Sequence, residues 1–477
     1  MSEFNYVSPL SQRYASPEMQ KLFSERTRAL LWRRLWVILA RAEHELGLPV
    51  TAAQADELAA HAGEVDLERC HRYERETRHD VMAHIRAYAD DCPTAAPIIH
   101  LGATSCYVGD NADIMIYRDA IRLIQARLCH ILENLGAFAL RYAATPTLAY
   151  THFQPAQPTT VGKRAALWMQ DLVLDLEELD FVLNTLRPLG CKGTTGTQAS
   201  FVELFHGDRE KVLELDRRIV AAMGFSEPIA VSGQTYTRKQ DARILNALAQ
   251  IAASAQKFAT DLRLLQHEKE VEEPFESTQV GSSAMPYKRN PMRSERITGL
   301  SRYLIGNAHN GLTTAAEQWL ERSLDDSANR RISMAEGFLC ADGILMLYEN
   351  ITSGLTVNER MIEKHLKAEL PFMATEGLLM RAVEKGGDRQ KVHEIIRKAA
   401  MDAGRRVKQD GAECDLLERL AQDPAFPLGE ADILTQLDPK SFTGIAAEQT
   451  ERFVKDTVQP ALARYKDLTR PEAKIVL

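Results

Sequence analysis

The segment GSSAMPYKRNP, residues 281–291, holds a dense set of side chains that could move a proton or bind an anion. Its leading glycine permits unusual backbone angles, and two serine hydroxyls follow directly. Lys288, Arg289 and Asn290 then precede a helix that we expect to open at Pro291. Such a loop could close over an anionic ligand and place a hydroxyl against it. The alternative is a solvated basic loop that only caps the helix.

Other polar segments lie between long stretches of regular apolar spacing. Loops held at the ends of rigid helices are common places for binding and catalytic groups. KGTTGTQASF (192–201) offers free backbone N–H groups and hydroxyls to an anion, but it lacks the spacing and the preceding strand of a dinucleotide or P-loop motif. The remaining segments are SPLSQRYASPEM (8–19), ETRHDVMAH (76–84), HLGATSCYVGDN (100–111), THFQPAQPTT (151–160), SGQTYTRK (232–239) and ERSLDDSANRR (321–331).

The stretches that must position these loops show the 3.6-residue apolar period of α-helices, and alternating strand patterns are scarce. The first predicted helix has Asp110 as its N-cap, and the second tolerates Pro158 in its first turn because that position needs no N–H donor. Helices of ~25–35 residues would be ~40–50 Å long. Such helices usually lie side by side in a bundle, often completed by other subunits. The predicted ranges are about 110–142, 158–186, 237–271, 291–322 and 326–355.

Length and composition indicate several domains within one acidic chain. The 477 residues, 45% of them hydrophobic, exceed one ordinary compact domain. We expect an all-α chain with an N-terminal helical domain (1–105), a central domain of long helices (106–357) and a C-terminal helical domain (358–477). The net charge of −8 argues against a nucleic acid or a membrane surface as partner.

Cysteine and histidine spacing argues against disulfides and metal sites. The seven cysteines include no Cys-x-x-Cys pair, which fits reduced thiols in the cytoplasm. None of the 13 histidines forms a His-Glu-x-x-His motif, so we expect neither a metal nor another cofactor. The N-terminus has no apolar signal segment, and no window reaches ~18 uninterrupted apolar residues. We therefore expect a cytoplasmic protein.

The segment at 281–291 resembles the signature GSSxMPxKxNP of the fumarase–aspartase superfamily. The polar segments together, in order, resemble the adenylosuccinate lyase family in the version found in animals. ELPFMATE (369–376) and LDPKSFTG (437–444) extend the resemblance into the last domain. One departure is Pro158, where an apolar residue is typical. The resemblance implies a three-domain fumarase/aspartase-like fold in which tetramerisation completes the central bundle.

This resemblance implies a cofactor-free β-elimination. Fumarate would leave adenylosuccinate, giving AMP, and would also leave the succinyl-aminoimidazole-carboxamide ribotide of purine nucleotide biosynthesis. His152 would be the general acid that protonates the departing amine. Ser282 would be the general base, activated by cations such as Lys288 once water is excluded, although the sequence does not distinguish it from Ser283. Glu295 would orient or charge the acid histidine.

The resemblance also implies a binding site for one phosphate and two carboxylates. Arginine suits such groups because its planar fork binds oxyanions in bidentate fashion. Any one of these arginines, taken alone, is more often a surface ion-pair residue, but their concentration in the motif loops indicates a site. The implied residues are Arg13 and Tyr14 on the phosphate side, Arg78, His79 and Asp80 lining the pocket, Thr104 and Ser105 at the succinyl carboxylates, Gln234 in the same region, and Arg296, Arg322, Ser327 and Arg331 in the nucleotide site.

One alternative lies within the same enzyme class, and a second belongs to another class. A sibling fumarate-releasing enzyme, such as argininosuccinate lyase, shares the signature, but RHDVMAH, SGQTYTRK and DDSANRR resemble the nucleotide version. A non-catalytic scaffold, such as the lens crystallins recruited within this superfamily, would be indicated by loss of His152 or Ser282, and both are present. By the same resemblance, we expect a homotetramer whose sites each draw motifs from three chains.

Overall fold

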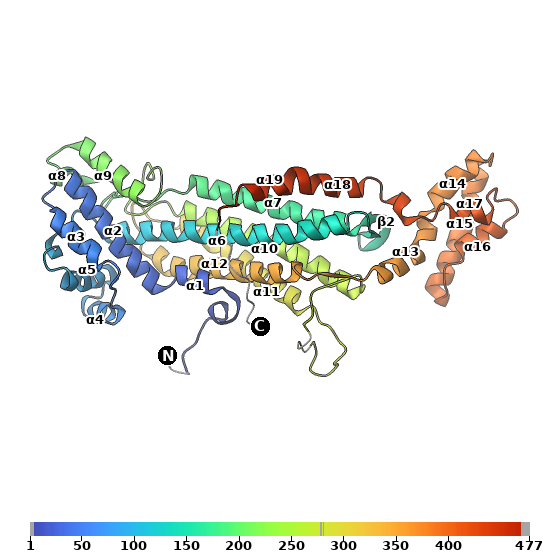
Figure 1. Ribbon diagram of the computed structural model, residues 1–477, viewed down its shortest axis with the longest axis horizontal. Coiled ribbons are helices and arrows are strands. Elements are labelled where there is room, and N and C mark those ends of the chain that lie inside the picture. Colours follow the sequence, from blue (N-terminus) through green and yellow to red (C-terminus); the bar gives the residue numbers. More distant parts are fainter. Residues whose placement is uncertain (1–3, 277–278, 280, 469–477) are drawn as a thin grey trace.

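The computed structural model describes residues 4–276, 279 and 281–468. Five long helices run side by side along the long axis of an elongated molecule (Figure 1). They are α6 (Ser105–Arg141), α7 (Val161–Thr185), α10 (Lys239–His267), α11 (Met292–Ala316) and α12 (Asp325–Thr352). The predicted all-α fold with a central bundle of long helices is therefore confirmed.

Helix α12 lies at the centre of the bundle because its second half is covered on every side. All residues from Gly337 to Tyr348 are buried, and a helix buried all round must be enclosed by other helices. The ring of Tyr348 stacks on Phe258 of α10 with centroids 4.1 Å apart. Phe258 in turn meets Trp168 of α7 edge-on at 5.0 Å. These rings join three helices around one core.

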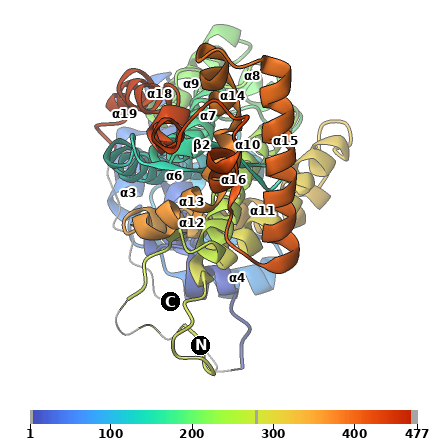
Figure 2. The same ribbon diagram turned by 90° about the vertical axis from the view of Figure 1, so that its right-hand side faces the viewer.

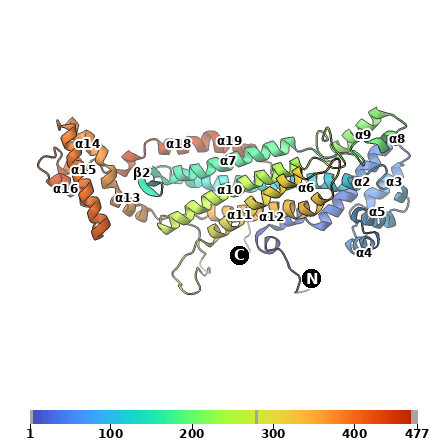
Figure 3. The ribbon, with the colours of Figure 1, turned by 180° about the vertical axis from the view of Figure 1, so that it is seen from behind.

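Shorter helices gather at the two ends of the bundle (Figures 1 and 3). One end has its own hydrophobic cluster, built from two separate stretches of the chain. Its helices are α2 (Glu25–Glu45), α3 (Ala52–His61), α4 (Leu67–Thr77), α5 (Asp80–Asp91), α8 (Ala199–Leu204) and α9 (Arg209–Ala222), with the short turn η2 (Ala96–Ile98).

The opposite end carries a third hydrophobic cluster, seen end-on in Figure 2. The chain then returns along the bundle, where Val454 and Val458 join the central cluster. The elements of this part are α13 (Glu359–Met373), α14 (Thr375–Glu384), α15 (Arg389–Arg405), η3 (Arg406–Asp410), α16 (Leu416–Gln422), α17 (Glu430–Leu434), η4 (Pro439–Phe442), α18 (Ala446–Phe453), η5 (Val454–Val458) and α19 (Gln459–Ala463). The domain boundaries at 105 and 357 stay a prediction.

Two small antiparallel sheets and the N-terminal turns complete the described part of the chain. The first sheet is the hairpin of β1 (Pro146–Thr151) and β2 (Gln154–Thr160), and the second pairs β3 (Val271–Glu272) with β4 (Thr356–Val357). The turn η1 (Leu10–Tyr14) packs against α12, so closely that a Cβ atom on Gly343 would lie 2.9 Å from the Cβ of Tyr14. Helix α1 (Pro17–Leu22) follows.

The predicted N-cap at Asp110 is wrong. Helix α6 already begins at Ser105, and Asp110 lies buried within it. Its carboxylate accepts the backbone N–H of Tyr236 at 2.9 Å and two N–H groups of Arg238. An aspartate suits a helix cap and a buried ion pair equally well, so its type and place before an apolar stretch did not distinguish the two roles.

The predicted helix start at Pro158 is also wrong. Pro158 lies in β2 opposite Leu148 of β1, and α7 begins at Val161. The helix is capped by Thr160, whose hydroxyl oxygen accepts the N–H of Lys163 at 3.1 Å. His152 and Phe153 take φ values of 52° and 57°, and this left-handed pair closes the hairpin. His152 therefore stands at a hairpin tip.

A buried ion pair fastens α6 to α12. The Nε of Arg127 donates to Oδ1 of Asp342 at 2.5 Å, and both side chains are fully buried. The second oxygen of Asp342 accepts the backbone N–H of Ser16 at 2.6 Å, which fixes the N-terminal segment on the bundle. Either charge buried without the other would be costly, because it would lose its hydration and gain no opposite charge in exchange.

Replacement of Asp342 by alanine should destabilise the protein strongly, because it leaves the buried guanidinium of Arg127 with only the more distant carboxylate of Glu349, 3.5 Å away. We expect a loss of about 3–5 kcal/mol, measured as a fall in the thermal unfolding midpoint. Glu363→Ala is the matched control, since Glu363 pairs with Arg360 at the surface and such pairs contribute about 0–1 kcal/mol. Equal thermal unfolding midpoints for the two variants would contradict the stabilising role of the buried ion pair between α6 and α12.

Candidate active site

A cavity of about 760 Å³ lies where the first turns of α6 and α12 meet α2 and the corner between α4 and α5. Its wall on α12 extends from Leu324 to Ala335, and its wall on α6 extends from Ser105 to Tyr117. Helix α2 contributes Arg28 and Trp32. The cavity therefore lies at one end of the bundle, among loops that the sequence marks as polar.

The corner between α4 and α5 aims polar groups at this cavity. Arg78 ends α4 in the left-handed region, with φ of 54°. His79 then caps α5, where its Nδ1 accepts the N–H of Met82 at 3.3 Å. A neutral ring that accepts at Nδ1 carries its proton on Nε2, so His79 can donate a hydrogen bond there. Asp80 forms an ion pair with Arg331 of α12 at 2.9 Å.

Three loops stack against each other beside the cavity, and two glycines allow their close approach. A Cβ on Gly196 would lie 1.9 Å from the carbonyl oxygen of Ser232, and one on Gly233 would lie 2.4 Å from that of Glu321. The backbone N–H of Gln234 donates to Glu321 at 3.0 Å. Residues 192–201, 232–239 and 321–331 therefore form one packed layer, although they are far apart in the sequence.

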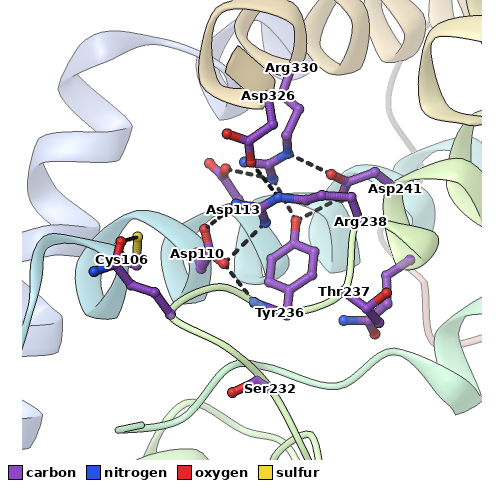
Figure 4. A network of polar contacts seen from close by, with 12 residues as sticks. Cys106, Asp110, Asp113, Ser232, Tyr236, Thr237, Arg238, Asp241, Asp326 and Arg330 are labelled. Carbon is purple, nitrogen blue, oxygen red and sulfur yellow. Dashed lines mark hydrogen bonds and ion pairs between the residues drawn. The ribbon is translucent and has the colours of Figure 1, made fainter. Parts of the chain in front are cut away.

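A buried row of charges forms part of the cavity wall and links three helix starts (Figure 4). Arg238 donates two hydrogen bonds to Asp110 of α6, at 3.0 and 3.1 Å, and one to Oδ2 of Asp326 of α12, at 2.6 Å. The other oxygen of Asp326 accepts from Arg322 at 2.6 Å. We call this set, Asp110–Arg238–Asp326–Arg322, the first rung. It ends on Arg322, which lines the cavity.

A second rung lies one helical turn further along the same helices (Figure 4). Arg330 of α12 pairs with Asp241 of α10 at 2.5 Å and with Oδ2 of Asp113 of α6 at 3.1 Å. The other oxygen of Asp113 lies 3.5 Å from Arg28 of α2. The second rung is therefore Asp241–Arg330–Asp113–Arg28. In each rung, two arginines balance two aspartates.

Burial and charge act in opposite directions within the rungs. Burial alone would raise the pKa of Asp326, but the guanidinium groups of Arg238 and Arg322 outweigh it and lower that pKa below its usual value. Burial also opposes the charge on Arg238, yet Asp110 raises the pKa of Arg238 above its ordinary value. Tyr236 is buried between the rungs, so its pKa rises well above normal, and its hydroxyl donates to Asp241 at 2.7 Å. At Asp110 burial prevails and raises the pKa, although Arg238 and Arg330 act against it. The charged form is therefore favoured at Asp326 and Arg238 and opposed by burial at Asp110.

The cavity brings together many of the residues that the sequence implied for substrate binding. Gln234 lies close by, because its Oε1 accepts from the thiol of Cys106, a cavity residue, at 3.6 Å. Thr104 precedes Ser105 directly at the start of α6. The implied residues that line the cavity are Arg78, His79, Asp80, Ser105, Arg322, Ser327 and Arg331.

The remaining implied residues do not line this cavity within the described part of one chain. Arg13 and Tyr14 lie in η1, which packs further along α12. His152 is exposed at the tip of the β1–β2 hairpin, toward the other end of the bundle in Figure 1. The segment before α11 and its first turn carry the rest, namely Ser282, Lys288, Glu295 and Arg296.

The segment around Ser282 is held mainly by backbone and amide contacts. The hydroxyl oxygen of Ser282 accepts the N–H of Met285 at 3.1 Å, and Asn290 donates to the carbonyl of Gly281 at 2.9 Å. Lys288 is exposed. Glu295 lies 3.9 Å from Arg263 of α10. Among the described residues of one chain, no contact joins Glu295 to His152, so the predicted role of Glu295 stays a prediction.

Sequence reasoning missed the buried charges at the cavity wall. Asp110, Arg238 and Asp326 all lie inside motif segments, but the motifs drew attention to their neighbours. A signal was present, because acids and arginines recur one turn apart at 110 and 113, 238 and 241, and 326 and 330. Which helices face each other decides how these charges pair, and spacing along one helix does not give that.

Among residues 4–276, 279 and 281–468, no group of three or more histidine, cysteine, aspartate or glutamate side chains is arranged to hold a metal ion. No helix in that part of the chain is both long enough and apolar enough to cross a bilayer.

Comparison with known families gives matches along most of the chain. The profile of a general lyase family matches residues 12–306, and that of the adenylosuccinate lyase C-terminus matches residues 371–453. The chain is 49% identical to an adenylosuccinate lyase of Saccharomyces cerevisiae, covering 98% of both chains. It is 46% identical to an adenylosuccinate lyase of Schistosoma mansoni, covering 100% of both.

Solved structures with the same fold are more distant in sequence. A 3-carboxy-cis,cis-muconate lactonizing enzyme from Pseudomonas putida matches with a TM-score of 0.81 at 22% identity, covering 96% of this chain and 99% of that one. A fumarate lyase from Mesorhizobium sp. BNC1 matches with a TM-score of 0.79 at 24% identity and the same coverage. At such identities the likeness concerns the fold alone.

Proposed function

The chain belongs to the adenylosuccinate lyase family, and we propose on that premise that it splits fumarate from adenylosuccinate, giving AMP, and from the succinyl-aminoimidazole-carboxamide ribotide of purine nucleotide biosynthesis. The full-length match to adenylosuccinate lyases carries this proposal. The arginine-rich cavity supports it, because the substrates carry a phosphate and two carboxylates. The relatives reported above give no support to argininosuccinate as the substrate.

The proposed chemistry is an elimination with one base and one acid. Ser282, as its alkoxide, removes a proton from the succinyl carbon next to a carboxylate. The C–N bond breaks, its electron pair moves to nitrogen, and protonated His152 supplies a proton to that nitrogen. Fumarate and the free amine leave, and one proton must pass back from the serine to the histidine. Lys288 is the cation proposed to stabilise the alkoxide.

The proposed binding roles follow from the donors around the cavity. Ser327 and Arg331 lie in the first two turns of α12, and Arg322 lies in the turn just before it. All three line the cavity and can donate to oxyanions of the nucleotide. His79 offers its Nε2–H, and the carboxylate of Asp80 is an acceptor beside it. Proposed further contacts come from Thr104, Ser105 and Gln234 at the loop layer and from Arg13, Tyr14 and Arg296, which lie elsewhere in one chain.

Separation of the proposed catalytic groups within one chain supports a shared site. His152 and Ser282 lie outside the cavity that holds His79 and Arg322. Helix α7 also presents a stripe of half-exposed apolar residues, Leu167, Leu174 and Phe181, spaced by seven. A stripe of that period fits a neighbouring helix. We therefore propose a homotetramer in which each site combines the cavity of one chain with loops of others, and a cytoplasmic location.

The purified protein should turn over both succinylated nucleotides, because a site that binds the phosphate and succinyl ends accepts either ring between them. Loss of the substrates' ultraviolet absorption would measure each reaction at matched concentrations. Argininosuccinate should give no fumarate. Turnover of one nucleotide alone, or of argininosuccinate, would count against the proposed activity.

Shared sites should allow two inactive variants to restore each other. His152→Ala and Ser282→Ala should each reduce turnover by about 10²–10⁴-fold. After the two proteins are mixed and subunits exchange, roughly a quarter of sites should carry both wild-type groups if these come from different chains. Lyase activity should then rise well above that of either parent.

Two controls make the exchange experiment decisive. Each variant taken alone through the same exchange should stay inactive. Ser283→Ala should keep near-normal turnover, whereas a loss there with an active Ser282→Ala would move the base by one residue. Mixed tetramers as inactive as their parents would show that both groups belong to one chain, and the shared site would be wrong.

A further inference from the structure

Each rung ends on an arginine that lines the cavity. Only one of these two arginines belongs to a motif segment of the sequence. Asp326 uses one oxygen for a buried arginine and the other for Arg322. Asp113 likewise uses Oδ2 for Arg330 and Oδ1 for Arg28. Arg322 belongs to the polar segment 321–331, whereas Arg28 lies in the middle of α2, outside every such segment. Arg28 therefore occupies the same place in the second rung as Arg322 does in the first.

Arg28 is less engaged by the protein than Arg322 is. Its distance to Asp113 is 3.5 Å, compared with 2.6 Å between Arg322 and Asp326. Its side chain is 34% exposed, compared with 23% for Arg322. Asp113 also lies closer to Arg330, at 3.1 Å, and so neutralises Arg28 only in part. Arg28 thus keeps N–H donors and charge for a ligand in the cavity that it lines.

The surroundings of Arg28 form a distinct part of the cavity. Along α12 the wall continues from Ser327 to Met334 and Ala335, and seven residues of helix span about 10 Å. Aromatic rings of Phe23, Trp32 and Tyr117 line the cavity as well. None of these three rings lies in a polar motif segment. Arg28 is the cation that α2 contributes beside them.

Trp32 is a second donor on this wall. It follows Arg28 by four residues and therefore lies on the same face of α2. The side chain is 6% exposed, and its indole N–H finds no acceptor among the described residues. A buried donor without an acceptor is unusual and calls for a partner. The cation of Arg28 lies one turn away on the same wall and is suited to an acidic group.

We propose that Arg28 is a substrate-binding residue, and that the part of the cavity beside Trp32 is an oxyanion subsite for one acidic end of the substrate. This inference rests on the proposed function, whose substrates carry a phosphate and carboxylates. Both are oxyanions that an arginine binds through paired N–H groups. The alternative is an ordinary exposed ion pair of α2 with α6, which would leave binding unchanged.

Arg28→Gln tests the subsite directly. Loss of one charge-assisted contact should raise KM for adenylosuccinate about 10- to 100-fold and leave kcat within about three-fold, because Arg28 touches no reacting atom. Arg28→Lys should recover part of the loss by restoring the charge. Arg34→Gln is the matched control, because Arg34 lies on the same helix outside this cavity.

Calorimetric titration of the same variants with AMP and with fumarate identifies the bound group and does not require turnover. Weaker AMP binding by Arg28→Gln alone assigns the phosphate, and weaker fumarate binding assigns a carboxylate. Wild-type protein that binds both products but lacks lyase activity would contradict the proposed function while the subsite stands. If Arg28→Gln matches Arg34→Gln in KM and in both titrations, or if wild-type protein binds neither product, the subsite is wrong.

Discussion

The guanidinium of Arg238, buried between Asp110 and Asp326, is the interaction on which the cavity depends. It joins the first turns of α6 and α12 through a residue at the start of α10. A buried charge that loses its partner costs several kcal/mol, so the three helix starts hold one mutual arrangement. Arg238 also uses a planar fork against Asp110, which fixes direction as well as distance.

Charge balance explains why such a polar layer is tolerated beside a hydrophobic bundle. Each rung contains two arginines and two aspartates, so no net charge is buried. The buried charges of each rung neutralise one another. The outer arginine, Arg322 in the first rung and Arg28 in the second, faces the cavity. The protein thereby presents cations that are positioned by carboxylates and yet open on one side. This arrangement suits recognition of an acidic nucleotide better than a loose surface arginine would.

Much of this architecture follows from the sequence, and the exceptions have physical causes. The apolar period gives the long helices because burial requires it. The predicted ranges for α10 and α12 lie within about four residues of those observed, whereas α11 ends about six residues before its predicted end. Pro158 was misplaced because a proline suits both a helix start and an edge strand. Asp110 was misplaced because its partner, Arg238, is distant in sequence. Motif resemblance led to Arg322 and Ser327, but Arg28 belongs to no motif and becomes visible only through its place beside Asp113.

Arg238 acts on the substrate through the position of Arg322, to which it is joined by Asp326. A double-mutant cycle of Arg238→Lys and Arg322→Gln, read as the affinity for AMP, tests it most directly, since lysine keeps the charge but cannot make the bidentate contact. We predict that the two losses of AMP affinity are strongly non-additive, with a coupling of about 0.5–3 kcal/mol. Once Arg238→Lys has displaced Arg322, replacing Arg322 removes little further binding energy. Arg34→Gln in place of Arg322→Gln should give no coupling. Additive losses for Arg238 and Arg322 would contradict this positioning role of Arg238.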